Sequence, residues 1–108
     1  MNPKVSIIIP VYNTELFLEQ CLSSAIHQTM QEIEIIVIND ASTDGSLNII
    51  NDFQVRDHRI KLIDFIENKG NGYGRNQASK IATGDYILFL DSDDWLEFNT
   101  AEIGRAHV

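Results

Sequence analysis

Basic residues are scarce in this chain of 108 residues, which has eight Lys and Arg against sixteen Asp and Glu and a formal net charge of −8. Lys and Arg are the side chains that replace counterions on nucleic-acid phosphates and anionic membranes. The composition therefore argues against nucleic acid or an anionic membrane as a direct partner. An anionic ligand needs either a bridging metal ion or a local basic spot.

Cysteine and long apolar runs are also scarce. The single cysteine, Cys21, lies in a helical pattern of apolar residues, which favours a buried small side chain over a reactive thiol and indicates a reducing compartment without disulfides. No apolar run approaches the ~18 residues that span a bilayer. The N-terminal MNPKVSIIIPVYN has too short an apolar core for a secretory signal. We expect a cytoplasmic location, with peripheral attachment at the inner membrane face as an alternative.

Four short runs of apolar, largely β-branched residues predict strands over residues 5–9, 33–38, 60–63 and 86–90, with Pro10 stopping the first. Apolar residues recur at helical spacing between them. They predict helices over residues 15–28, after the ASTDGS loop, and from Arg75 to a C-cap at Gly84. This alternation predicts an α/β fold, in which a parallel sheet of Rossmann-like type is joined by right-handed crossover helices.

A polar cluster follows each predicted strand, at residues 10–13, 40–46, 67–74 and 91–94. In open α/β sheets, ligands bind outside the carboxyl ends of the strands. We therefore expect four loops to face one crevice.

Asp91, Asp93 and Asp94 follow the fourth strand directly. Carboxylates so close repel one another and resist ionisation unless a positive charge lies among them. Asp91 and Asp93 can bind one hard cation, Mg²⁺ or Mn²⁺, with water or phosphate oxygens completing its shell. A solvated acidic turn is the alternative. A calcium loop is excluded, since Trp95 and Leu96 occupy positions where that motif needs Asp or Asn and Gly.

A glycine-rich segment, GNGYGRNQ, precedes the third helix and ends in a basic residue, Arg75. Backbone N–H groups around Gly72 can approach a phosphate there, and Arg75 supplies local positive charge. The spacing matches neither a Walker loop nor the dinucleotide fingerprint. Flexible-turn glycines are the alternative interpretation.

Asp40 ends the second strand, where its carboxylate can accept the imide N–H of a uracil, and Tyr12 of the neighbouring loop can stack on the base. Each residue also has a simpler interpretation. Asp40 can cap the next helix, and Tyr12 can close the core.

Four segments, VSIIIPVYN, IIVINDASTDGS, NKGNGYGRNQA and GDYILFLDSDDW, together resemble the nucleotide-binding half of the family 2 glycosyltransferases, which are inverting enzymes with a GT-A type fold. The resemblance runs from about Val5 to Thr100, so residues 1–100 are expected to form an incomplete nucleotide-sugar-binding half-domain. It implies a set of residues that bind the nucleotide sugar: Pro10, Val11, Tyr12, Asp40, Gly72, Arg75 and Asp94. Asp91 and Asp93 resemble the metal and diphosphate site of the family, with Mn²⁺ or Mg²⁺ as the cofactor.

The resemblance implies transfer of a sugar from a nucleotide sugar, most often a UDP-sugar, to an acceptor hydroxyl of a polysaccharide, glycolipid or glycoprotein. The cation neutralises the departing diphosphate. The general base and the acceptor-binding half of such enzymes lie beyond the D-x-D pair. We therefore name no catalytic residue, and we expect a metal-dependent transferase as the parent protein and an inactive fragment in this chain.

Two alternatives belong to other classes. One is a nucleotide-binding module without catalysis; the other is a nucleotidyltransferase, which is disfavoured because PVYNTE lacks the glycine and lysine of its first loop. The final EIGRAHV, residues 102–108, looks like a translated sequencing adapter, and we expect it to be an artefact.

Overall fold

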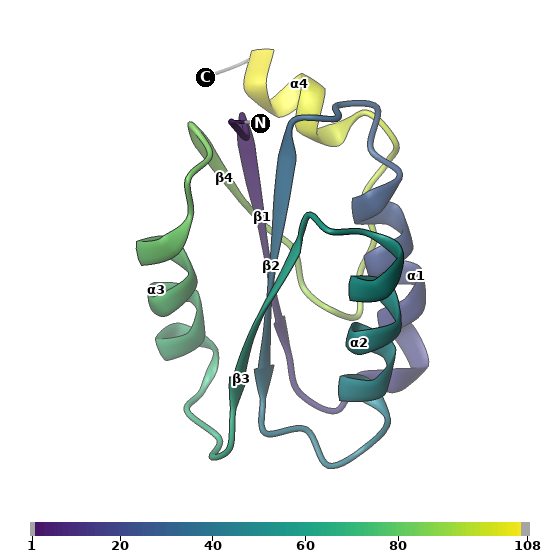
Figure 1. Cartoon of the computed structure of the whole chain (residues 1–108), viewed down its shortest axis with the longest axis vertical. Coiled ribbons are helices and arrows are strands. Elements are labelled where there is room, and N and C mark those ends of the chain that lie inside the picture. The colour runs from purple at the N-terminus through teal and green to yellow at the C-terminus, as the bar shows by residue number, and fades with distance from the viewer. Residues whose placement is uncertain (1, 107–108) are drawn as a thin grey trace.

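Strands and helices alternate along the chain as predicted, in a computed structural model that describes residues 2–106. The elements are β1 (Val5–Val11), α1 (Glu15–Ile26), β2 (Ile33–Asp40), α2 (Ser46–Arg56), β3 (Ile60–Phe65), α3 (Asn71–Ile81), β4 (Tyr86–Phe89) and α4 (Thr100–Ala106) (Figure 1). Within the described residues, no helix is both long and apolar enough to cross a membrane.

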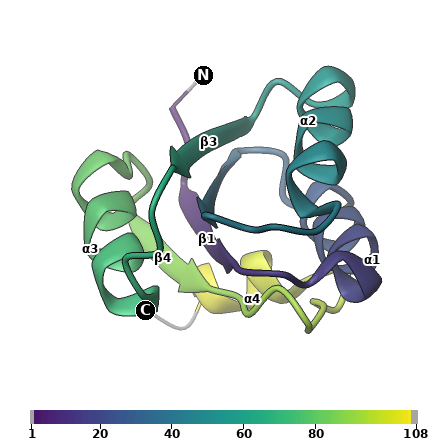
Figure 2. The ribbon, with the colours of Figure 1, turned by 90° about the horizontal axis from the view of Figure 1, so that it is seen from below.

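All strand pairs are parallel, and the sheet has the order β3-β2-β1-β4. The sheet lies between two helical layers, with α3 on one face and α1 and α2 on the other (Figure 2). The loops that leave β1, β2 and β3 meet at the lower end of the molecule in Figure 1. The predicted α/β fold is confirmed, and its topology brings the polar loops to one edge of the sheet.

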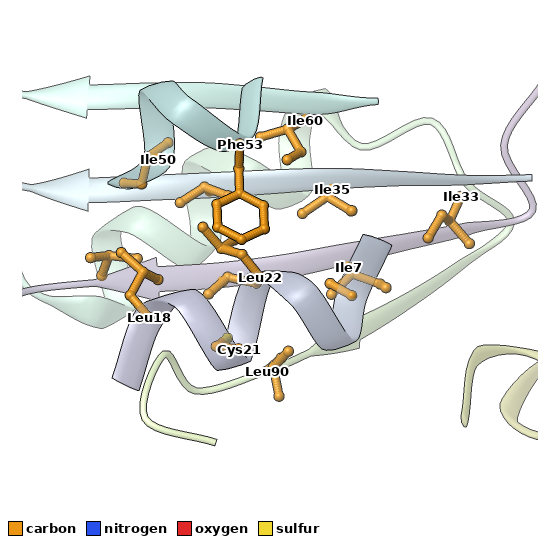
Figure 3. Close-up of a cluster of buried hydrophobic side chains, with 14 of the residues drawn as sticks. Ile7, Leu18, Cys21, Leu22, Ile33, Ile35, Ile50, Phe53, Ile60 and Leu90 are labelled. Carbon is orange, nitrogen blue, oxygen red and sulfur yellow. The ribbon is translucent and has the colours of Figure 1, made fainter. Parts of the chain in front are cut away.

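The core lies on both faces of β1 and β2, whose residues are all buried. Leu18, Cys21 and Leu22 of α1 and Ile50 and Phe53 of α2 pack against one face (Figure 3). A smaller cluster joins the other face to Ala78 of α3. Burial of each large aliphatic side chain contributes roughly 1.5–3 kcal/mol, so the continuous apolar runs of β1 and β2 account for their central positions. The prediction that Cys21 is a buried hydrophobe is confirmed.

Pro10 does not stop β1, which continues to Val11 and pairs Pro10 with Ile38 of β2. The carbonyl of Ile8 accepts the N–H of Leu90, so Ile8 faces β4, and Pro10 faces the same side two residues later. The ladder with β4 has ended by then, at the pair of Ile8 and Phe89. No strand therefore needs the N–H that proline lacks.

Helix α3 begins at Asn71, four residues before the predicted start at Arg75. Gly70 precedes the helix with a φ of 86°, which favours glycine, and its carbonyl accepts the N–H of Gly74. A Cβ on Gly74 would lie 3.0 Å from Cγ2 of Ile38. Gly74 therefore lets the helix approach β2 closely, and Gly72 and Gly74 belong to the first turns of the helix rather than to a loop.

Glu34 is a buried carboxylate at the second position of β2, near the amino end of the sheet. Its Oε1 accepts from Lys61 Nζ of β3 at 2.7 Å, and its Oε2 accepts from the hydroxyl of Ser6 on β1 and from the backbone N–H of Thr83. Burial raises the pKa of Glu34, but the hydrogen bonds from Lys61, Ser6 and Thr83 outweigh it and lower the pKa to about 2. Glu34 thereby joins three strands to the turn between α3 and β4.

Helix α4 is tied to the loop between α1 and β2. Ala101 is buried and donates its N–H to Oε1 of Gln28 at 2.9 Å, while Glu102 accepts from the hydroxyl of Thr29 at 2.8 Å. The predicted artefact covers residues 102–108, of which 107 and 108 lie outside the described residues. The origin of residues 102–108 stays a prediction.

Candidate functional site

A cavity of about 490 Å³ lies at the carboxyl ends of the strands, where the loops after all four strands meet. It is lined by Pro10, Tyr12, Thr14, Asp40, Asn68, Gly70, Asn71, Asp91, Ser92 and Asp93. The expected crevice is therefore present. Sequence reasoning missed Thr14, Asn68, Asn71 and Ser92, although each lies within a few residues of a predicted site residue.

A second cavity of about 580 Å³ lies at the opposite, amino-terminal ends of the strands, with Lys4, Glu34, Arg59 and Lys61 in its wall. Its central carboxylate already has partners on both oxygens. The smaller cavity contains exposed carboxylates and an exposed aromatic ring, so it is the better candidate for chemistry.

Asp40 lies at the end of β2 and is 3% exposed. Its Oδ1 and Oδ2 accept the backbone N–H groups of Lys69 at 2.6 Å and Gly70 at 2.8 Å. These bonds fix the loop between β3 and α3 beside the cavity. Each carboxylate oxygen has a second lone pair, so Asp40 can still accept from a ligand. The interpretation of Asp40 as a cap of the next helix is wrong, because its carboxylate accepts from the loop before α3, while the first N–H of α2 donates to Asp44.

Tyr12 and Val11 differ sharply in exposure although they are neighbours. The side chain of Val11 is fully buried in the core, so it does not line the cavity. Tyr12 is 48% exposed at the cavity wall, which rules out its alternative role of closing the core. Its ring is available for stacking on a planar ligand.

Hydrogen bonds join the loop after β1 to the loop after β2. Asn13 has a φ of 51°, and its Oδ1 accepts the N–H groups of Thr43 at 2.7 Å and Asp44 at 3.2 Å. The Asp44 carboxylate accepts the N–H of Glu15 in α1 at 3.2 Å and that of Ser46 in α2 at 2.9 Å. Burial raises the pKa of Asp44, but these hydrogen bonds outweigh it and lower the pKa. One carboxylate therefore accepts the first N–H of two helices and steadies the loop that carries Tyr12.

Asp91, Ser92 and Asp93 of the D-x-D loop all line the cavity but differ in exposure. Asp91 and Asp93 are exposed and line the cavity, while Ser92 between them is buried and accepts from the hydroxyl of Thr14 at 2.9 Å. The N–H of Asp94 donates to the carbonyl of Asp91 at 3.0 Å and closes a tight turn. These two hydrogen bonds therefore hold the backbone of the turn, which carries the two carboxylates at the cavity.

Arg75 lies on α3 and reaches the D-x-D loop, where its Nη2 is 3.2 Å from Oδ1 of Asp91. Its guanidinium also lies 5.6 Å from the centre of the Phe89 ring. Arg75 thus connects α3 to the acidic turn after β4. Gly72, Arg75 and Asp94 lie outside the wall of the cavity itself.

The donor set suits a hard cation. Among residues 2–106 no cluster of three or more His, Cys, Asp or Glu side chains is arranged around a metal position. Asp91 and Asp93 offer two exposed carboxylates, and Mg²⁺ commonly binds through one or two carboxylates with phosphate oxygens and water as further ligands. The residues present fit a cation that a phosphate ligand shares.

The family model described as Glycosyl transferase family 2 matches residues 6–103. The chain is 45% identical over 102 residues to Glycosyltransferase GlyA of Streptococcus pneumoniae serotype 4, and that match covers 94% of this chain and 14% of GlyA.

Two solved structures share the fold. The structure of S. aureus TarS 1-349 in complex with UDP-GlcNAc matches with a TM-score of 0.88 and 35% identity, over 95% of this chain and 30% of that chain. The mannosyltransferase PcManGT from Pyrobaculum calidifontis, in complex with GDP-Man and Mn²⁺, matches with a TM-score of 0.79 and 26% identity, over 88% of this chain and 29% of that chain. The chain spans less than a third of the length of GlyA, TarS 1-349 or PcManGT.

Proposed function

This chain belongs to glycosyl transferase family 2 and shares the GT-A type fold of TarS; from that premise we propose that its cavity binds the nucleotide-sugar donor of a glycosyl transfer reaction. The observation that carries the proposal is the composition of one cavity. An exposed aromatic ring, a buried carboxylate and a pair of exposed carboxylates all line it. A nucleoside diphosphate has the complementary parts, a planar base and a charged diphosphate.

At the base end, Tyr12 stacks on the uracil and Asp40 accepts its imide N–H through a free lone pair. Asp40 is well placed for this role because two backbone N–H groups already hold its carboxylate still. Pro10 also lines this cavity. Val11 and Gly72 contribute backbone rather than side chain.

At the diphosphate end, Asp91 and Asp93 hold Mn²⁺ or Mg²⁺, with Asp94 assisting from the same turn. The complex of PcManGT with GDP-Man and Mn²⁺ supports this assignment. When bound, the cation neutralises the charge that develops on the departing diphosphate. Arg75 adds a second positive charge from α3.

The reaction is an inverting transfer from a UDP-sugar to an acceptor hydroxyl of a polysaccharide, glycolipid or glycoprotein. The complex of TarS with UDP-GlcNAc supports UDP as the carrier. Residues 1–100 supply the donor-binding half of such an enzyme. The general base and acceptor site come from an acceptor-binding half, and none of the site residues above takes that role.

The test is a titration of UDP into the chain, followed through the fluorescence of Trp95, the only tryptophan and the residue after Asp94. We expect saturable binding with Mn²⁺, at least tenfold weaker binding in EDTA, and loss of the Mn²⁺ effect in Asp93→Asn. Asp52→Asn, which changes an exposed aspartate on α2, is the matched control and should bind as the wild type does. Equal affinity in Mn²⁺ and EDTA would remove the metal from the proposal.

A further inference from the structure

Within the described residues, Arg75 is the basic residue that contacts the D-x-D loop. Its Nη2 lies 3.2 Å from Oδ1 of Asp91, and this is a single contact. The two side chains come from different elements, α3 and the loop after β4. Asp93, on the same turn, has no ion pair among the described residues. The two carboxylates proposed as metal ligands are therefore not equivalent.

The guanidinium of Arg75 makes few of the hydrogen bonds that it can donate. Its Nε is buried and has no hydrogen-bond partner among the described residues. An arginine carries five N–H donors in a planar fork, and it binds phosphate best through two parallel hydrogen bonds. One contact to one carboxylate oxygen leaves most of that capacity free, beside a cavity with room for a diphosphate.

We propose that Arg75 and Asp91 form a latch that exchanges partners on ligand binding, an inference that rests on the proposed function. Without ligand, Arg75 occupies Oδ1 of Asp91 and takes the place of the cation. When a nucleoside diphosphate enters, Arg75 transfers to the phosphate oxygens and releases Asp91 for the divalent cation. The latch links nucleotide and metal binding, so each ligand strengthens the other by the same factor.

The exposure of the pair limits the strength of the latch. The Arg75 side chain is 39% exposed and that of Asp91 is 66% exposed. Water and salt screen such pairs, and the cost of opening one corresponds to about a two- to fivefold change in an equilibrium constant. The latch therefore opens readily, but its effect on affinity is large enough to measure.

The experiment is a double-mutant cycle on UDP affinity in EDTA, with the full 108-residue chain and Trp95 fluorescence as the readout. Asp91→Asn frees Arg75 and should tighten UDP binding about two- to fivefold more than Asp93→Asn, which removes the same charge from the same turn. In an Arg75→Gln background, Asp91→Asn and Asp93→Asn should change UDP affinity equally. The latch would be overturned if Asp91→Asn and Asp93→Asn changed UDP affinity equally in the presence of Arg75. It would also be overturned if Asp91→Asn still bound UDP more tightly than Asp93→Asn in the Arg75→Gln background.

A second measurement covers the case in which Arg75→Gln binds UDP too weakly for the cycle. Mn²⁺ alone, followed by water-proton relaxation, should bind Arg75→Gln about two- to fivefold more tightly than the wild type. Lys69→Gln removes a nearby cation that pairs with Glu67 instead, and it should leave Mn²⁺ affinity unchanged. An equal gain in both variants would show only a change of net charge. A wild-type chain that binds UDP neither in Mn²⁺ nor in EDTA would instead overturn the proposed function.

Discussion

Replacing Glu34 by Gln should remove a large part of the stability of this fold at neutral pH. The pKa of Glu34 falls from its ordinary 4.5 to about 2, because hydrogen bonds from Lys61, Ser6 and Thr83 outweigh the effect of burial. Each unit of pKa difference between the folded and unfolded chain corresponds to about 1.4 kcal/mol, so the ionised carboxylate contributes on the order of 3 kcal/mol. The Glu34 side chain is 3% exposed but that of its partner Lys61 is 51% exposed, so screening by water makes this value an upper figure.

The stabilisation by Glu34 should depend on pH in a defined direction. A lowered folded pKa means that the stabilisation is complete above the unfolded pKa of 4.5 and is lost as the pH falls towards 2. The free energy of unfolding of the wild type should exceed that of Glu34→Gln by about 3 kcal/mol at pH 7, and about 2 kcal/mol of this difference should be gone by pH 3. Asp44 and Asp57 also have lowered pKa values, and the comparison with the variant cancels their contributions.

Urea denaturation followed by far-UV circular dichroism at pH 7, 5, 4 and 3 measures both free energies. Glu67→Gln is the matched control, since Glu67 is an exposed glutamate whose ion pair with Lys69 is long, at 3.6 Å. Its free energy of unfolding should stay within about 0.5 kcal/mol of the wild type. If the free energies of unfolding of wild type and Glu34→Gln differed by the same amount at pH 7 and at pH 3, the lowered pKa of Glu34 would not account for the stabilisation.

Three further perturbations test other parts of the structure. Gly84→Ala should cost roughly 1–3 kcal/mol in urea denaturation, because its Cβ would lie 2.7 Å from the backbone N of Ser6; Gly72→Ala, with open space around it, should cost nothing. Asp44→Ala should cost about 1–2 kcal/mol by the same assay, since the first N–H groups of α1 and α2 both lose their acceptor; a loss confined to a few tenths would contradict this double role. Burial and nearby Asp94 raise the pKa of Cys21 to about 12, so a disulfide reagent at pH 8 should modify the thiol only after denaturation, and rapid reaction of the native chain would contradict its burial.

The order of the elements could be predicted from local patterns, most directly for β1 and β2, which are buried on both faces. Continuous β-branched runs and helical spacing between them specified the order of the elements, and parallel topology then brought the polar loops to one edge. Tyr12, Asp40, Asp91 and Asp93 were found in this way, and the structure brings all of them to one cavity.

The remaining features depend on contacts between distant parts of the chain. Pro10 stays within β1 only because β4 has already ended beside it, and α3 lies close to β2 because Gly74 leaves room for Ile38. The hydroxyl of Thr14 meets Ser92 across 78 positions of sequence. No local pattern carries such pairings, so the sequence predicts which residues gather at the site better than how they hold one another.

We propose that a nucleoside diphosphate and a divalent cation share the cavity at the carboxyl ends of the strands. Backbone amide NMR of the ¹⁵N-labelled chain tests its location directly, with UDP added first and Mn²⁺ second. We expect UDP to shift the amide signals of Tyr12, Asp40 and Gly70, and Mn²⁺ then to broaden those of residues 91–94. Shifts and broadening centred on the cavity around Glu34, with the signals of residues 91–94 unchanged, would contradict this proposal.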